Sequence, residues 1–276
     1  MGHGDCQDIR AGWGGAERIP GGAADFLAEY SIPCEQRRLI TSDGVELDAL
    51  RLGREPGRAV VICHGFGGNK NVAGLVACAE SLAADFRVYV FDFRGHGLSG
   101  GTCTLTAREV DDLEAVLSLA RDEGNRRVGV LGFSMGGVVA LRYAAERGGL
   151  DCLVVVSVPC RWEEARAPGA RFLRFLFLTA PGRGLLKSRF GVRMDPDADL
   201  PPSPADLVGR LGTQPLTIVA GADDFIFEAE QARQLHRLAG NAARLRVFDG
   251  FGHAELGCGP LFFQYVKEVL REDLGR

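Results

Sequence analysis

The chain has 276 residues, 46% of them apolar and 25% charged, so it is long enough to bury a full hydrophobic core. Its net charge of −4 and isoelectric point near 5.8 give no electrostatic reason to expect nucleic acid or an anionic membrane as a partner. A small or neutral substrate fits this composition better, and one domain is the default organisation.

The first 25 residues are rich in glycine and lack the basic start and apolar core of a secretory signal. We therefore expect residues 1–25 to be a loosely ordered segment and the protein to remain in the cytoplasm. No apolar run reaches the roughly 18 to 20 residues that span a bilayer, so no stable membrane insertion is expected.

The eight cysteines are scattered without a CxxC pair. This spacing favours reduced, buried thiols over a disulfide framework or a zinc site.

Strand-like and helix-like patterns alternate from residue 35 onward. Residues 35–53 predict two strands joined by a turn at Ser42, Asp43 and Gly44. Further strands are predicted from apolar runs at 58–65, 86–93, 127–133, 150–159, 214–223 and 243–250. Helices are predicted between and after them at 71–85, 107–123, 135–149, 228–240 and 259–273. The alternation predicts an α/β fold, with a mostly parallel eight-stranded sheet flanked by helices.

Residues 160–214 interrupt this alternation between the sixth and seventh strands. A connection of that length is uncommon in a compact domain unless it forms a lid or is disordered. Phe172, Phe175 and Phe177 argue against full disorder. We therefore expect a small helical cap over the carboxyl ends of the strands, inserted in a domain of residues 26–276. A purely structural excursion is the alternative.

Ser134 stands in "GFSMG", where an apolar strand changes into an apolar helix. The GxSxG pattern is weak by itself in a chain so rich in glycine, but it has mechanical meaning at a sharp strand-to-helix turn. Such a turn exposes the serine hydroxyl, and Gly132, Gly136 and Gly137 allow the strand and the helix to approach closely. We therefore predict that Ser134 is a nucleophile.

A serine nucleophile needs a base, and the base needs an acceptor that orients it. His253 follows the last predicted strand and lies downstream of Ser134, which is the order that favours it as the base. Asp223 and Asp224 both follow the strand at 214–223, and only one of them can point into the crevice from an extended backbone. We select Asp224 as the acid.

These motifs give the chain a resemblance to the α/β-hydrolase superfamily from about Cys34 to the C-terminus. The resemblance rests on "HGFGG", "DFRGHGLS", "GFSMGG", "GADD" and "GFGH" in that order. The first two also resemble bacterial serine esterases and acyl hydrolases of the cinnamoyl-esterase, monoacylglycerol-lipase and serine-aminopeptidase type. "HGFGG" departs from the "HGGG" of one lipase and esterase branch, which puts that branch's alcohol preferences in doubt here.

The resemblance implies an oxyanion hole made by the backbone N–H groups of Phe66 and Met135, with His64 bracing the oxyanion loop. It further implies ester hydrolysis through an acyl-enzyme, a reaction that requires no metal and no organic cofactor. For the substrate-binding residues we select Phe66, Trp162, Phe172 and Phe175. The expected partner is a small-molecule ester, and a homodimer is left open.

Other activities would use the same three residues. An aminopeptidase, a thioesterase, a carbon–carbon bond hydrolase and a haloperoxidase all remain open. An aminopeptidase needs acidic side chains near the crevice to hold the substrate amine, and Glu163 and Glu164 could serve. A ligand receptor that keeps the triad without turnover is the alternative from outside the enzymes.

Overall fold

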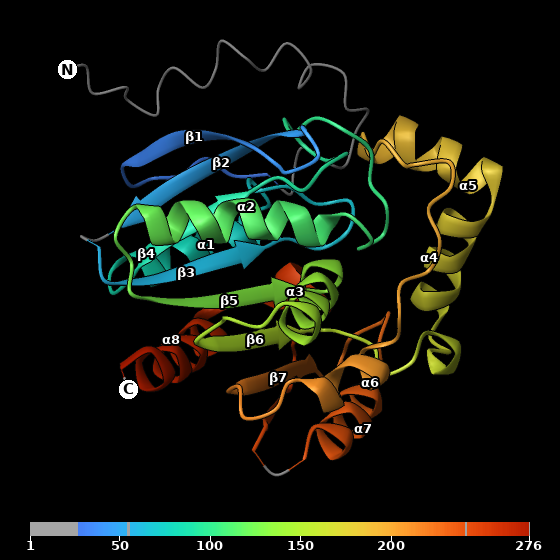
Figure 1. Cartoon of the computed structure of the whole chain (residues 1–276). Coiled ribbons are helices and arrows are strands. Elements are labelled where there is room, and N and C mark those ends of the chain that lie inside the picture. The colour runs from blue at the N-terminus through green and yellow to red at the C-terminus, as the bar shows by residue number, and fades with distance from the viewer. Residues whose placement is uncertain (1–26, 54–55, 241, 276) are drawn as a thin grey trace.

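The computed structural model describes residues 27–53, 56–240 and 242–275. Its centre is an eight-stranded sheet in the order β1-β2-β4-β3-β5-β6-β7-β8 (Figure 1). The strands are β1 (Cys34–Ile40), β2 (Glu46–Gly53), β3 (Arg58–Cys63), β4 (Arg87–Phe91), β5 (Arg127–Phe133), β6 (Cys152–Val156), β7 (Leu216–Gly221) and β8 (Arg244–Phe248). β2 pairs antiparallel with β1 and with β4, whereas every other neighbouring pair is parallel. The sheet predicted from the alternation is confirmed.

Helices cover both faces of this sheet. They are α1 (Ala73–Ala83), α2 (Glu109–Asp122), α3 (Met135–Glu146), α7 (Ala229–Ala239) and α8 (Pro260–Gly275). Side chains of α1 and α8 share one apolar cluster with β3 through Val60 and Ile62. Side chains of α2, α3 and α7 share the other cluster with β3 through Ala59 and Val61. Successive side chains of a strand point to opposite faces, so a continuous apolar run such as β3 is buried on both sides.

The segment between β6 and β7, residues 160–214, is called the insert below. Its elements are η4 (Trp162–Glu164), α4 (Pro168–Leu178), α5 (Ala180–Leu185), the π-helical turn η5 (Leu186–Phe190), α6 (Pro204–Leu207) and η6 (Val208–Arg210). Figure 1 shows α4 and α5 beyond the arrowheads of β3, β5 and β6, where the carboxyl ends of the parallel strands meet. The predicted insertion after the sixth strand is therefore helical and lies at the edge where the loops gather.

Backbone hydrogen bonds fasten the insert to the rest of the domain. The N–H of Cys103 donates to the carbonyl of Arg193 at 2.7 Å, and the N–H of Arg193 donates to the carbonyl of Gly95 at 2.9 Å. At the start of the insert, the Cys160 N–H donates to Oε1 of Gln231 on α7 at 2.8 Å. Residue 160 is thus fixed to α7 and residue 193 to the loop after β4, and α4 and α5 lie between these two attachments.

The cysteines differ in one respect from the sequence prediction. Free thiols are found at Cys63, Cys78, Cys103, Cys152, Cys160 and Cys258, as expected. Cys34 is instead disulfide-bonded, which corrects the prediction for this residue. Cys34 opens β1 at the edge of the sheet and is itself buried, as are five of the six free thiols. Residues 1–25, predicted to be loosely ordered, lie outside the described residues. Within the described part of the chain, no helix combines the length and the hydropathy of a membrane span.

Candidate active site

Ser134 occupies the turn between β5 and α3. Its backbone has φ +46° and ψ −113°, a conformation that non-glycine residues rarely adopt. The Ser134 N–H donates to the carbonyl of Val156 at the end of β6, 2.8 Å away, and this bond holds the turn in place. The side chain is therefore presented at the carboxyl end of the sheet by a strained backbone, as the motif predicts.

The glycines around Ser134 are required by close backbone approaches. A Cβ at Gly132 would lie 2.6 Å from the carbonyl oxygen of Gly136, so this residue lets β5 and α3 meet closely. A Cβ at Gly136 would lie 2.4 Å from the carbonyl oxygen of Cys63, so Gly136 makes room for the end of β3. A Cβ at Gly137 would lie 2.6 Å from the Val158 side chain. These distances are too short for any side chain, and each glycine has a separate packing reason.

Three side chains from three loops meet at this turn. Nε2 of His253 lies 3.0 Å from Oγ of Ser134, and Nδ1 of His253 lies 2.9 Å from both carboxylate oxygens of Asp224. Because Nδ1 faces a carboxylate, it carries the proton, and Nε2 is left to accept from the serine hydroxyl. The Asp224 side chain is 0% exposed and that of His253 is 10% exposed, so water competes little for these bonds.

Asp224 is fixed by backbone donors. Its Oδ1 accepts from the N–H groups of Ile226 at 2.8 Å and Phe227 at 2.9 Å. Asp223 is exposed, and its side chain makes no hydrogen bond to His253. The loop that carries His253 passes close to the end of β7. A Cβ at Gly221 would lie 2.0 Å from the Phe251 carbonyl oxygen, so only glycine fits there. The structure therefore brings Asp224, and not Asp223, to the histidine.

The loop after β3 provides the other wall of the site. The N–H groups of Phe66 and Met135 donate to no other group among the described residues. Met135 is the first residue of α3, where free N–H groups and the helix dipole favour an anion. Nδ1 of His64 donates to the Gly65 carbonyl at 2.7 Å, while its Nε2 accepts from the Phe93 N–H at 3.0 Å. Burial lowers the pKa of His64 and keeps the ring neutral for these two bonds.

A buried ion pair stiffens the same loop. Nζ of Lys70 lies 2.6 Å from Oδ2 of Asp92 and 2.8 Å from Oδ1 of Asp48. The Asp92 carboxylate also accepts from the backbone N–H of Lys70 at 2.7 Å and of Leu98 at 2.9 Å. The contacts join the loops that follow β3 and β4. A loop that is held this firmly has little freedom to move its free N–H groups.

Glu255 is a site residue that the sequence reasoning missed. It lies two residues after His253. Its Oε1 accepts from the N–H of Gly65, the residue before Phe66, at 2.5 Å. Burial raises the pKa of Glu255, and the hydrogen bond from Gly65 opposes this effect. The Ala254 N–H between them donates to Oγ of Ser157 at 3.0 Å. The carboxylate therefore ties the histidine loop to the oxyanion loop across 190 residues of sequence, and no local motif signals such a pair.

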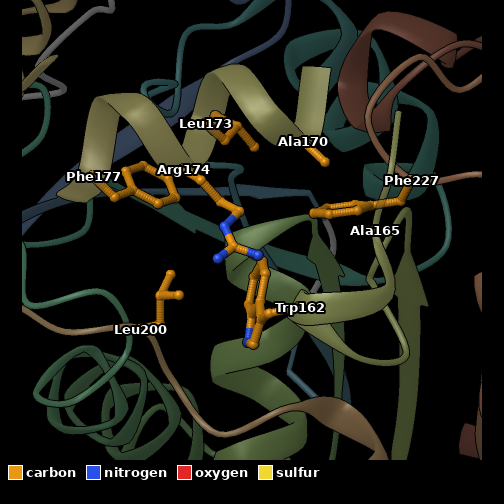
Figure 2. Close-up of a pocket in the computed structure, with 8 residues that line it drawn as sticks. All are labelled: Trp162, Ala165, Ala170, Leu173, Arg174, Phe177, Leu200 and Phe227. Atoms are coloured by element: carbon orange, nitrogen blue, oxygen red, sulfur yellow. The ribbon is translucent and has the colours of Figure 1, made fainter. Parts of the chain in front are cut away.

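An apolar pocket lies under α4, mostly between residues of the insert itself (Figure 2). The residues that line it are Trp162, Ala165, Ala170, Leu173, Arg174, Phe177, Leu200 and Phe227. Phe227 packs edge-on to the His253 ring at 5.6 Å between ring centroids, and Phe177 packs edge-on to Phe66 at 4.6 Å. The pocket thus borders His253 and the loop after β3 that carries Phe66. The free space inside it is about 10 Å³, which is room for about one water molecule, so its walls lie close together.

The structure places the four residues predicted to bind substrate in different surroundings. Trp162 lines the pocket and Phe66 contacts its wall, but Phe172 and Phe175 are 50% and 43% exposed and stack on each other at 6.3 Å. The α4 residues that do line the pocket are Ala170, Leu173, Arg174 and Phe177. Their spacing of three, four and seven residues defines one side of a helix, and Phe172 and Phe175 lie on the other side.

The comparisons with known proteins identify a family and a fold. A protein-family model described as serine aminopeptidase, S33, matches residues 54–199, slightly more than half of the chain. Among solved structures, an esterase of Pyrococcus furiosus has a TM-score of 0.71 and 22% sequence identity, covering 92% of this chain and 96% of that chain. At that identity, the likeness shows the fold, and the fold is that of the α/β-hydrolases.

Two curated relatives carry different activities in their names. The chain is 34% identical over 118 residues to the pimeloyl-[acyl-carrier protein] methyl ester esterase of Edwardsiella ictaluri, which covers 41% of this chain and 42% of the relative. It is 34% identical over 104 residues to the proline iminopeptidase PfmaB of Pestalotiopsis fici, which covers 37% of this chain and 36% of the relative. The first curated relatives are matched over only 35% and 33% of their length.

Proposed function

The chain belongs to the serine aminopeptidase, S33, family of α/β-hydrolases, and from this premise we propose that it hydrolyses carboxylic esters of small to medium acyl groups through Ser134. The observation that carries the proposal is the hydrogen-bonded series Ser134 Oγ, His253 and Asp224, with its distances of 3.0 and 2.9 Å. A serine with a base on one side and a carboxylate behind that base is an activated nucleophile.

The reaction proceeds in two steps. Nε2 of His253 takes the proton of Ser134, whose Oγ adds to the ester carbonyl and forms a tetrahedral intermediate. The intermediate collapses when the bond to the alcohol oxygen breaks, and His253 gives its proton to the departing alcohol. Water then attacks the acyl-enzyme with His253 again as the base, and this step releases the carboxylic acid and restores Ser134. Asp224 keeps the proton on Nδ1 and stabilises the imidazolium formed in each step.

The N–H groups of Phe66 and Met135 form the oxyanion hole in this proposal. Donors that are free and held in place before the reaction need no reorganisation when charge develops on the substrate oxygen. Each such donor is worth on the order of 3 to 4 kcal/mol in the transition state. The Lys70–Asp92 pair and the His64 hydrogen bonds support this role because they fix the loop that carries Phe66.

An aminopeptidase is the second candidate, since the family description and one relative's name point to it. Peptide amines are cationic and need acidic partners near the crevice. Glu163 and Glu164 are exposed and do not line the pocket, and the charged side chain that does line it is Arg174, a cation. Placing an ammonium group beside Arg174 would be repulsive. This charge arrangement favours an ester over a peptide amine as the substrate.

A direct comparison of ester and amide substrates tests the proposal. We expect turnover of p-nitrophenyl acetate and butyrate, and at least about 100-fold lower kcat/KM on proline and alanine p-nitroanilides. Two effects act together in the anilides: their ammonium group is repelled by Arg174, and p-nitroaniline is a poorer leaving group than p-nitrophenol. The measurement is release of the coloured product at one pH. Faster turnover of the anilides would replace the esterase proposal with the aminopeptidase. Stoichiometric capture of a ligand with no product would favour a receptor.

The contact between Glu255 and Gly65 leads to a second prediction. Glu255→Ala is expected to lower kcat about tenfold with little change in KM, because the loop that carries Phe66 loses its tie and the oxyanion hole loses its preorganisation. Glu255→Gln keeps an oxygen that accepts from the Gly65 N–H, so it should restore most of kcat. The pair is measured on p-nitrophenyl acetate. Equal losses in both variants would mean that the charge, and not the hydrogen bond, is what matters.

A further inference from the structure

We propose that the substrates of this enzyme carry an anionic group remote from the scissile carbonyl, and that Arg174 selects them by binding that anion. The inference rests on the proposed ester hydrolysis and names the substrate class for the same site. It starts from the composition of the pocket wall. Seven of the eight residues that line the pocket have apolar side chains, and the eighth is Arg174. Figure 2 shows its side chain reaching from α4 toward the indole of Trp162, alongside the pocket.

Arg174 has no acidic partner within the described part of the chain. Arg174 is exposed, whereas two half-buried arginines of the insert are paired with protein oxygens. Arg161 pairs with Asp206 at 3.2 Å, and Arg183 donates to the carbonyl of Phe177 at 2.7 Å and of Ala198 at 3.0 Å. Arg174 takes part in no ion pair or hydrogen bond with the residues described. A guanidinium beside an apolar pocket with its donors unused is suited to a carboxylate or a phosphate.

The charge of residues 165–194, the segment around Arg174, also favours an anionic ligand. Residues 165–194 contain seven basic residues and no acidic residue, although the whole chain has a net charge of −4. This segment includes α4, α5 and η5, the helices that cover the site. Like charges gathered over one opening raise the local concentration of ligands of opposite charge. The segment that carries α4, α5 and η5 is therefore basic in a chain whose net charge is negative.

A structural role for Arg174 makes a different prediction. If its aliphatic stem only covers Trp162, its removal should lower the stability of the insert and affect all esters equally. If its charge binds the substrate, its removal should change the preference between charged and neutral esters. The preference between two substrates is therefore the quantity to measure, because it separates these two roles.

The test uses pairs of esters that differ in charge but not in length. On the acyl side, monomethyl glutarate is compared with methyl pentanoate, and the half-esters of succinate and adipate vary the distance to the anion. On the alcohol side, the acetate ester of 3-hydroxypropanoate is compared with propyl acetate. The ratio of kcat/KM, anionic over neutral, is measured for the wild-type protein and for Arg174→Gln by acid release.

We expect Arg174→Gln to lower this ratio about tenfold in one of the two arms, which is the size of effect of a partly solvated charge-assisted contact. The arm that responds identifies whether the anion belongs to the acyl or the alcohol group. The matched control is Arg171→Gln, which removes the same charge from the same helix at a position that is also exposed but does not line the pocket, and it should leave the ratio unchanged.

Two results would overturn the inference. One is an unchanged ratio for Arg174→Gln in both arms, with its fold verified by circular dichroism and thermal unfolding. The other is an equal fall of the anionic-over-neutral ratio for Arg171→Gln, which would mean that the total positive charge of the insert, and not a contact with Arg174, attracts the anion. Turnover of the neutral esters reports separately on the proposed function, so a protein that hydrolyses methyl pentanoate but shows no dependence on Arg174 contradicts only the anion preference.

Discussion

Ser134→Ala is expected to lose ester hydrolysis by on the order of 10⁶-fold in kcat, the size of loss that follows when a serine hydrolase loses its nucleophile. The substitution removes only Oγ, so the hydrogen bond from the Ser134 N–H to Val156 and the turn itself should remain. The same variant should no longer react with a fluorophosphonate probe, and peptide mapping of the wild-type adduct should place it on residue 134.

The control for this experiment is Ser188→Ala, which removes an exposed hydroxyl whose contact is with the Leu185 carbonyl in the insert. Its activity and labelling should match those of the wild-type protein. Both variants should unfold within a few degrees of the wild-type melting temperature, since neither removes buried apolar area. A Ser134→Ala protein that labels or hydrolyses esters as well as the wild type would show that the nucleophile lies elsewhere.

Asp224→Asn is expected to lower kcat by on the order of 10³ to 10⁴ while leaving KM nearly unchanged. The Asn side chain can still accept from the N–H groups of Ile226 and Phe227, because its oxygen can take the place of Oδ1. Its amide then faces Nδ1 of His253 as a donor, which forces the proton onto Nε2 and leaves Ser134 without a base. The loss therefore comes from the tautomer and not from the fold.

Asp223→Asn is the matched control for this prediction. It removes one negative charge from the neighbouring position, but the Asp223 side chain is exposed and makes no bond to His253. We expect its kcat to stay within about tenfold of the wild-type value, since an exposed charge is screened by solvent. Both variants are measured on one p-nitrophenyl ester at one pH. A larger loss for Asp223→Asn would reverse the assignment of the acid.

The sequence by itself determined the sheet and the three residues that meet at its carboxyl end. Both results follow from local patterns. Apolar runs of strand length that alternate with helical periods require crossovers, and crossovers require a parallel sheet. Parallel strands place the residues that follow them along one edge, so Ser134, Asp224 and His253 could be brought together without knowledge of any distance. The alternation of side chains in an extended backbone allowed only one of Asp223 and Asp224 to face the crevice, and Asp224 was selected by its position three residues after Gly221.

Only the tertiary structure decided which side of α4 lines the pocket. The sequence "RFLRFLFL" places phenylalanine on both sides of this helix, so its pattern does not distinguish the side facing the domain from the side facing solvent. Phe172 and Phe175, which were predicted to bind substrate, lie on the exposed side, and Leu173, Arg174 and Phe177 line the pocket.

Contacts between distant segments were also beyond the reach of the sequence. Glu255 and Gly65 are 190 residues apart, and their hydrogen bond exists because two loops end at the same edge of the sheet. The disulfide at Cys34 is another case, since spacing alone does not tell which thiol finds a partner. Periodicity reports that a face is buried, but the identity of the group it meets depends on how the elements are placed in three dimensions. For that reason the triad could be predicted from the sequence, whereas the Glu255 contact and the side of α4 that lines the pocket could not.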